Sequence, residues 1–314
     1  MATVAGVDIG GTNISVALVD DEHQVGDRHK RSTPTDGPDA VLEVVAELLG
    51  ELDEEPAAVG VGMPGPVDDG VVSHPPNLQN WPEPVDVGGR LSEAVAMPVA
   101  VGNDANVGVL GEWVAGAGRG SKFLLGVWMG TGVGGGLVLD GRPYTGSVGG
   151  AGEFGHMIVH AGGAQCGCGR RGCIEAYGGR ANMERAAERA AAGGFPTTLF
   201  EIRDDKGKDR LTSSVWDRAL DQGDKLAVRL FNEAVEAVAI GIASVINLLD
   251  VDRIVLGGGL AEKLGDDLAE QVEEAARPHV FLPSAKRQIV LAELEDDAGM
   301  VGAAALGRAA MLLG

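Results

Sequence analysis

Apolar residues alternate with small or polar ones near the start of the chain and predict β-strands over residues 5–9 and 14–19. The short stretch Gly10-Gly11-Thr12-Asn13 separates them, so the two strands are expected to form a hairpin. Residues 24–31 are a third candidate strand. This part of the chain therefore predicts an antiparallel meander.

The next segment alternates between two periodicities. Residues 39–52 and 87–96 place apolar side chains at helical spacing, whereas residues 57–62 and 99–102 are short apolar runs typical of buried strands. A further helix is expected to begin at Asp104 or the residue after it. A meander followed by alternating helix and strand predicts an α/β fold with a mixed sheet.

The opening pattern recurs in the middle of the chain. Residues 123–129 and 135–140 predict strands, with Gly130-Thr131-Gly132 between them. We interpret the two halves as distant copies of one unit. The other predicted elements are helices over 173–192, 225–249, from 260 onward and 299–313, and strands over 253–256 and 289–291.

Length and composition predict a globular protein of two lobes. The chain has 314 residues, of which 45% are hydrophobic. We expect a small α/β lobe over residues 1–117, completed by a C-terminal helix at 298–314, and a large α/β lobe over 118–297. No secretory leader opens the chain, and no uncharged apolar run approaches the roughly 18 residues of a membrane span, so a cytoplasmic protein is expected.

Acidic residues outnumber basic ones by 46 to 25, which gives a formal net charge of −21. This charge argues against a nucleic-acid partner, whose phosphates bind basic surfaces. The acidic side chains are spread along the chain rather than gathered in a tail. Such a halophilic distribution is typical of proteins adapted to high salt, where screening weakens self-repulsion. The alternative is a merely acidic, mesophilic protein.

All three cysteines of the chain lie within eight residues: Cys166, Cys168 and Cys173. With His156 upstream they would complete a tetrahedral zinc set, and a set without an open position is structural. Inert thiols, or a disulfide with a spare thiol, are the alternative, but an odd number of cysteines without a secretory signal disfavours disulfides. His160 is the rival fourth ligand; only His156 belongs to a Glu-x-x-His pair, with Glu153.

Two glycine turns are candidates for phosphate binding because exposed N–H groups and a threonine hydroxyl can hold phosphate oxygens. They are Gly10-Gly11-Thr12-Asn13 and Gly130-Thr131-Gly132. Asp8, beside the first turn, would suit Mg²⁺, directly or through water. Either turn could be an ordinary hairpin. Their equivalent places in two similar halves favour a nucleotide triphosphate held between lobes.

Other nucleotide-binding motifs fit less well. Gly130-x-Gly132-x-x-Gly135 matches the dinucleotide fingerprint in letters, but a strand and a turn follow it instead of a helix. No lysine follows glycine at the spacing of a Walker A loop. Gly257-Gly258-Gly259, between a strand and a helix, could let adenine and ribose lie against the backbone. It could equally serve a close strand–helix contact.

Asp104 follows a predicted strand and opens a predicted helix. An aspartate there is often only a helix N-cap. A carboxylate at the C-terminal end of a strand in an α/β fold nevertheless lies where ligands bind. Phosphoryl transfer to a hydroxyl needs a group that accepts the hydroxyl proton, so Asp104 is the candidate general base.

Together these segments resemble the ROK family (repressors, open reading frames and kinases) of the actin-like sugar kinases. The resemblance covers almost the whole chain and rests on Asp8-Ile9-Gly10-Gly11-Thr12, Pro64-Gly65, Gly102-Asn103-Asp104-Ala105-Asn106, Gly130-Thr131-Gly132, Glu153-Phe154-Gly155-His156, Cys166-x-Cys168-Gly169-x-x-Gly172-Cys173-x-Glu175 and Gly257-Gly258. It implies a two-lobed actin-like ATPase (ribonuclease H-like) fold. Mixed sheets would carry flanking helices, with nucleotide and sugar in the interlobe cleft.

The family's enzymes resemble bacterial glucokinases, which use ATP and Mg²⁺ to phosphorylate the 6-hydroxyl of a hexose. By this resemblance Asp104 is the general base and Asn103 binds the sugar. Ring hydroxyls would be bound by Glu153, His156 and Glu175, with Gly65 and Asn77 lining the same pocket. The nucleotide would contact Asp8, Gly10, Gly11, Thr12, Asn13, Gly130, Thr131, Gly132, Gly257 and Gly258. His156 would also ligate the structural Zn²⁺.

The acceptor sugar is open, because fructokinases, N-acetylmannosamine kinases and N-acetylglucosamine kinases share these motifs. We expect glucose, since the Glu-x-x-His and Cys-x-Glu segments look most like the glucokinase subgroup, although residues 77–81 depart from its usual form. Polyphosphate-using relatives generally lack the cysteines, so ATP is the expected donor. Kinases of the family commonly resemble homodimers or homotetramers.

Two non-enzymatic functions are disfavoured. Many ROK proteins carry a DNA-binding helix-turn-helix ahead of this domain, but here the first phosphate-turn motif already starts at residue 8, and the net charge of −21 opposes DNA. A sugar sensor without catalysis would not need both Asp8 and Asp104. The expected partners are therefore ATP and a small hexose, without nucleic acid or membrane.

Overall fold

The computed structural model describes residues 3–313, so residues 1, 2 and 314 of the expected lobes lie outside it. The chain divides into two compact units. Unit 1 comprises Met1–Ser121, Gly136–Gly152 and Glu293–Gly314, and unit 2 comprises Lys122–Gly135 and Glu153–Ala292. The expected lobes placed residues 136–152 in the larger one. In the structure this segment packs within unit 1, where Asn106 Nδ2 donates to the Ala151 carbonyl at 3.3 Å.

Unit 1 is built on a five-stranded sheet of order β3-β2-β1-β4-β8. Its strands are β1 (Val4–Ile9), β2 (Asn13–Val19), β3 (His29–Ser32), β4 (Val59–Met63) and β8 (Val99–Asn103). The first three pair antiparallel, whereas β4 and β8 add in parallel, which confirms the predicted mixed sheet. Strand β3 is shorter than predicted: Val25 forms only an isolated antiparallel bridge with Val19, and the regular strand begins at His29.

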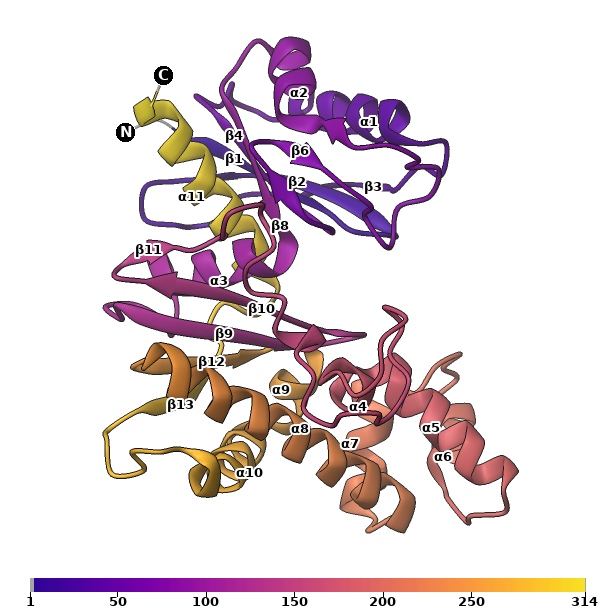
Figure 1. The fold of residues 1–314 in the computed structure, drawn as a ribbon. Coiled ribbons are helices and arrows are strands. Elements are labelled where there is room, and N and C mark those ends of the chain that lie inside the picture. Colours follow the sequence, from indigo (N-terminus) through magenta and orange to yellow (C-terminus); the bar gives the residue numbers. More distant parts are fainter. Residues whose placement is uncertain (1–2, 314) are drawn as a thin grey trace. The chain divides into compact units, whose positions relative to one another are not determined.

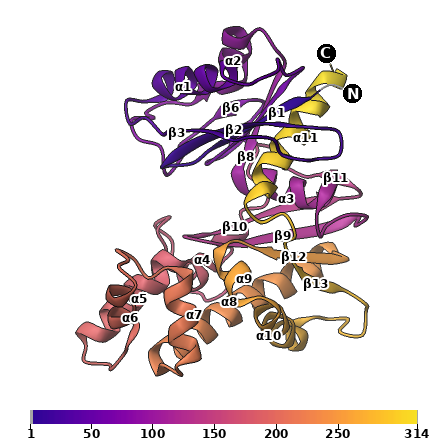
Figure 2. The same ribbon diagram turned by 180° about the vertical axis from the view of Figure 1, so that it is seen from behind.

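Helices cover both faces of this sheet (Figure 1; Figure 2). Helices α1 (Pro38–Gly50) and α2 (Val87–Val95) lie on one face. Helix α11 (Ala298–Leu313) lies on the other and packs against α3 (Asp104–Ala115). A small antiparallel sheet of β5 (Val67–Asp68), β6 (Val71–Val72) and β7 (Val85–Asp86) completes the unit.

The two faces of the first sheet carry different residues. Val59 and Val61 of β4 join the core under α1 and α2. Side chains alternate across a strand, so Gly60 faces α11, where an added Cβ would overlap the Ala303 carbonyl. An added Cβ would also collide with α11 at Gly6 and Gly102, and at Gly62 it would lie tightly, at 3.2 Å, against Val107 of α3. Glycine on this face thus lets α11 approach the sheet backbone directly.

A buried carboxylate ties α3 to the segment that leads into α11. Glu112 is fully buried, and its carboxylate accepts hydrogen bonds from the N–H groups of Ala117 (2.8 Å), Glu293 (3.1 Å) and Leu294 (2.8 Å). Burying a carboxylate is costly unless its oxygens are satisfied. These three donors therefore fix the path of the backbone between β13 and α11.

The second sheet has the order β11-β10-β9-β12-β13. Its strands are β9 (Phe123–Met129), β10 (Val133–Leu139), β11 (Arg142–Pro143), β12 (Arg253–Gly257) and β13 (Gln288–Leu291). Strand β12 pairs in parallel with β9 and β13, and the division between the units falls within β10, at Gly136. Both sheets place their first strand third in the order, which agrees with the predicted internal repeat.

A short helix η3 (Glu295–Asp297) precedes α11 in unit 1, and the other helices belong to unit 2. They are η1 (Phe154–His156), α4 (Glu175–Gly178), α5 (Arg180–Ala192), α6 (Leu199–Asp205), α7 (Ser213–Asp221), α8 (Lys225–Leu249), α9 (Gly259–Leu264), α10 (Asp266–Ala276) and η2 (Arg277–His279). The single helix predicted over 173–192 breaks at Gly179, whose backbone is extended. Helix α8 is long and apolar enough to cross a membrane by length and composition alone, but 56% of its apolar window is buried, as in a core helix.

We predict that Gly60→Ala destabilises the protein by about 1–3 kcal/mol or more, because the new methyl group must displace the backbone of α11. The control is Gly50→Ala, since an added Cβ at Gly50 has nothing within 4 Å. Urea unfolding of both variants gives the comparison. Equal stability of Gly60→Ala and the parent would refute the close packing.

Candidate active site

The predicted site residues are divided between the two units. Unit 1 holds Asp8, Gly10, Gly11, Thr12, Asn13, Gly65, Asn77, Asn103 and Asp104. Unit 2 holds Gly130, Thr131, Gly132, Glu153, His156, Cys166, Cys168, Cys173, Glu175, Gly257 and Gly258.

Two carboxylates of unit 1 lie at the carboxyl ends of parallel strands. Asp8 of β1 is paired with Gly62 of β4, which is paired with Gly102 of β8, and Asp104 follows two residues later. Desolvation, followed by the negative charge of Asp104, raises the pKa of Asp8 to about 6. Desolvation also raises the pKa of Asp104. Both side chains are exposed at the surface even though protein atoms surround them, so a ligand can reach them.

Asn103 rather than Asp104 caps helix α3. Its Oδ1 accepts hydrogen bonds from the N–H groups of Ala105 (3.0 Å) and Asn106 (3.2 Å), and its Nδ2 donates to the Gly65 carbonyl at 3.2 Å. Gly65 has φ +98°, a conformation that favours glycine. The Asn103 side chain thus fixes the start of α3 and leaves the Asp104 carboxylate as the first side chain of the helix.

The first glycine turn lies between β1 and β2. The Gly10 N–H donates to the Asn13 carbonyl at 2.9 Å, and Thr33 Oγ1 donates to the Gly10 carbonyl at 2.6 Å. Within residues 3–313, no backbone hydrogen bond of the turn uses the N–H of Gly11 or Thr12 as donor. An added Cβ on Gly11 would lie 2.8 Å from the Cβ of Asn77, so the structure brings this predicted pocket residue to the turn.

The second glycine turn has the same design. The Gly130 N–H donates to the Gly132 carbonyl at 3.0 Å. Helix α5 begins against this turn, because the N–H groups of Arg180 and Ala181 donate to the carbonyls of Gly130 (3.2 Å) and Thr131 (3.0 Å). Its exposed Thr131 hydroxyl and short backbone loop suit phosphate oxygens.

The structure brings His156 and the three cysteines together. One ligand atom from each lies within 4.8 Å of the others. Cys168 Sγ lies 3.7 Å from Cys173 Sγ, and Cys166 Sγ lies 3.9 Å from His156 Nδ1. Tetrahedral Zn²⁺ with bonds of about 2.3 Å to sulfur separates its sulfur ligands by about 3.8 Å, so this donor set fits the ion. His160 lies apart from the cluster, with Nδ1 3.2 Å from the Tyr177 hydroxyl.

Two carboxylates adjoin this cluster. Glu153 Oε2 lies 3.9 Å from His156 Nε2, the ring nitrogen that does not face Cys166. Glu175 Oε1 lies 3.4 Å from Cys166 Sγ, while Oε2 accepts the Val133 N–H at 3.1 Å. Glu175 therefore connects the cysteine loop to the residue that follows the second glycine turn, a link that motif spacing alone did not reveal.

Packing gives a reason for the glycines at the end of β12. An added Cβ on Gly257 would lie 2.9 Å from the Trp128 ring, and one on Gly258, with φ +81°, would lie 2.9 Å from the Met129 carbonyl oxygen. Both contacts join β12 to β9. These glycines thus serve close packing in unit 2, and their contact with a nucleotide stays a prediction.

Sequence reasoning missed a cation beside the second turn. Arg180 Nη2 lies 3.5 Å from Thr131 Oγ1, and Arg180 Nη1 donates to Ser213 Oγ. Desolvation lowers the pKa of Arg180, with a further contribution from Arg210. The sequence carried no signal for this group, because Thr131 and Ser213 are distant from Arg180 along the chain.

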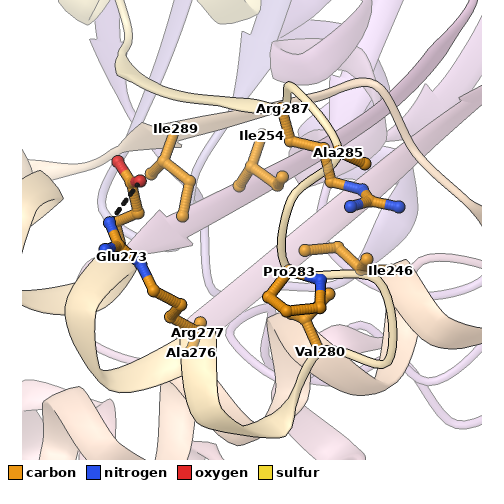
Figure 3. A pocket seen from close by; sticks show the side chains of 10 residues that line it. All are labelled: Ile246, Ile254, Glu273, Ala276, Arg277, Val280, Pro283, Ala285, Arg287 and Ile289. Carbon is orange, nitrogen blue, oxygen red and sulfur yellow. Dashed lines mark hydrogen bonds and ion pairs between the residues drawn. The ribbon is translucent and has the colours of Figure 1, made fainter.

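A separate cavity in unit 2 is unrelated to these residues (Figure 3). It measures about 60 Å³ and lies among apolar side chains of α8, β12, β13 and α10, with Arg277 and Arg287 at its edge. Small-molecule sites usually enclose about 300–1,000 Å³, so this space is too small for a hexose or a nucleotide. None of the predicted site residues lines it.

Comparison with known proteins places the chain in a family. Residues 4–310 match the ROK family, and the chain belongs to it. It is 33% identical to a glucokinase of Streptomyces coelicolor, over 98% of each chain. It is 34% identical to an N-acetylgalactosamine kinase of Shewanella, over 96% of each. A Streptomyces griseus ROK family glucokinase, solved with glucose and AMPPNP, has a TM-score of 0.82 and 31% identity, covering 98% of this chain and 99% of that one. The predicted family and two-lobed α/β fold are confirmed.

We predict that the purified protein carries one zinc ion per chain, measured by mass spectrometry of the metal. His156→Ala should lower zinc affinity by at least about 10-fold, because it removes one of the four side chains that bind the ion directly. His160→Ala, the matched control, should keep the parent's zinc content. Loss of zinc from His160→Ala and not from His156→Ala would contradict the ligand assignment.

Proposed function

We propose that this ROK family member is an ATP-dependent sugar kinase that phosphorylates the 6-hydroxyl of a hexose, with glucose as the preferred acceptor. The observation that supports it most is the position of Asp104, a desolvated carboxylate at the start of α3, near Asp8. Carboxylates that are partly desolvated, accessible to a ligand and coupled in charge are typical of catalytic acids and bases. Membership in a family with glucokinases among its relatives supports the same conclusion.

In the proposed reaction the sugar 6-oxygen attacks the γ-phosphorus of ATP. The bond from that phosphorus to the β–γ bridging oxygen breaks, and ADP leaves. Asp104 accepts the hydroxyl proton, so its carboxylate must be ionised before the step. Asp8 would hold Mg²⁺, directly or through water, and this ion would neutralise phosphate charge. The two glycine turns, 10–13 and 130–132, would hold the phosphates through backbone N–H groups and threonine hydroxyls.

The sugar contacts proposed in unit 2 are Glu153, His156 and Glu175. His156 Nδ1 faces the cysteines, so Nε2 would be free to meet a sugar hydroxyl while zinc fixes the ring. Glu175 Oε2 accepts the Val133 N–H and Oε1 lies 3.4 Å from Cys166 Sγ, so a sugar hydroxyl would share Oε1 with the cysteine. Gly65, Asn77 and Asn103 of unit 1 would complete the sugar contacts.

The candidate activities differ in the sugar that accepts the phosphoryl group. Glucose is supported by the glucokinase relatives and by the Glu-x-x-His and Cys-x-Glu segments. The N-acetylgalactosamine kinase and an N-acetylmannosamine kinase, similar at 34% and 31% identity, keep N-acetylhexosamines in competition, and fructose is a further alternative. We further propose a cytoplasmic enzyme of glycolysis, assembled as a homodimer or homotetramer, whose charge of −21 suits high salt.

We predict that Asp104→Asn lowers kcat by about 10²–10⁴-fold, because the amide cannot accept the proton. The dissociation constant of ATP should change little, and the exposed Asp53→Asn should behave as the parent. Desolvation raises the pKa of Asp104, and only its ionised form can accept the proton. As the pH is lowered, kcat/KM of the parent should therefore begin to fall at a higher pH than the pKa of an ordinary aspartate would give. A near-normal kcat in Asp104→Asn would overturn the base assignment.

A panel of sugars tests the acceptor. Initial rates with ATP should give the highest kcat/KM for glucose over fructose, N-acetylmannosamine, N-acetylglucosamine and N-acetylgalactosamine. A sugar epimer that leaves a carboxylate of the site without its hydroxyl partner should have a lower kcat/KM. Higher kcat/KM for another sugar would replace glucose within the same reaction. No ATP consumption with any sugar would instead favour a non-catalytic sensor or repressor.

A further inference from the structure

We propose that Arg180 contacts the phosphate groups of the bound nucleotide in unit 2. The inference rests on the proposed function, because it assumes that the turn at 130–132 binds a nucleotide. It goes further by assigning a side chain that neither the motifs nor the family resemblance included. The chemical class it recognises is the di- or triphosphate group of a nucleotide.

The position of Arg180 is fixed by the backbone. It is the first residue of α5, and its N–H donates to the Gly130 carbonyl at 3.2 Å, while the next N–H, from Ala181, donates to Thr131 at 3.0 Å. The start of the helix is thus hydrogen-bonded to the turn itself. Any ligand held by that turn would lie close to the base of the Arg180 side chain.

The guanidinium lies where three chain segments meet. Nη2 is 3.5 Å from Thr131 Oγ1 in the turn, and Nη1 donates to Ser213 Oγ at the start of α7. An added Cβ on Gly259, at the start of α9, would lie 3.2 Å from Nη1. Glycine at 259 therefore makes room for the guanidinium beside the turn.

The charge of Arg180 lacks a carboxylate partner at contact distance. Among the residues that the structure describes, none of the ion pairs includes Arg180, and its hydrogen bonds go to two neutral hydroxyls. The charges of Glu262 and Glu184 both favour the charged form of Arg180. Glu184 is occupied by Arg210 Nε at 2.7 Å and the Leu211 N–H at 3.1 Å. An anionic ligand at the turn would add a direct ionic partner to this partly desolvated cation.

Phosphate is the ligand that best suits this cation. The planar guanidinium presents paired N–H donors that match two oxygens of one phosphate. In a chain with 46 acidic and 25 basic residues, a local positive charge beside a phosphate turn also offsets general repulsion of an anionic nucleotide. A purely structural role, in which Arg180 only joins α7 to the turn, is the alternative that an experiment must separate.

Calorimetric titration of the full chain with ADP, ATP and adenosine distinguishes phosphate binding by Arg180 from a purely structural role. The variants are Arg180→Ala, Arg180→Lys and Arg180→Gln; the last keeps amide donors for Ser213 and Thr131 but has no charge. Arg189→Ala, at an exposed position of the same helix, is the control. Thermal melting checks that each variant is folded.

We expect Arg180→Ala and Arg180→Gln to raise the dissociation constants of ADP and ATP by about 10–100-fold. Adenosine affinity should change by less than about 2-fold, and Arg180→Lys should retain part of the binding. ADP affinity that survives in Arg180→Gln, or an equal loss for adenosine, would overturn the assignment in favour of a structural or nucleoside contact. A parent protein that binds neither ADP nor ATP would instead refute the proposed function on which the inference rests.

Discussion

Backbone-to-backbone packing of α11 is the constraint on which unit 1 depends. Glycine at alternate strand positions, such as Gly60, lets this helix touch the sheet. The helix also packs closely on α3, because an added Cβ on Gly111 or Gly302 would overlap backbone atoms of the facing helix. Close-packed elements have little room to shift. Asp104 opens α3, so the same packing holds the carboxylate in one place, as a reacting group requires.

In unit 2 a single carboxylate joins the metal-binding loop to the second glycine turn. Glu175 contacts Cys166 through one oxygen and the Val133 N–H through the other. An added Cβ on Gly132 would overlap this carboxylate, so glycine is needed at that position for packing as well as for phosphate approach. A bound zinc would therefore stiffen the turn as well as the cysteine loop.

Strong periodicity made part of the fold predictable. The strand at Phe123–Met129 and the helix at Lys225–Leu249 have the predicted bounds, because both are long, apolar and closed by glycine or acidic residues. Helices α6 and α7 escaped prediction, since short helices carry few periodic positions. The motifs also located Asp104, but not that Asn103 caps the helix, which depends on contact with Gly65. Arg180 was beyond prediction because its neighbours come together only in three dimensions.

The central claim is that the carboxylate held at the start of α3 takes the proton from a sugar hydroxyl. A crystal structure of the protein with glucose and a non-hydrolysable ATP analogue tests it most directly. We predict that the 6-hydroxyl oxygen lies within about 2.6–3.2 Å of an Asp104 carboxylate oxygen. A bound sugar whose hydroxyl groups all lie beyond hydrogen-bond reach of Asp104 would contradict the account.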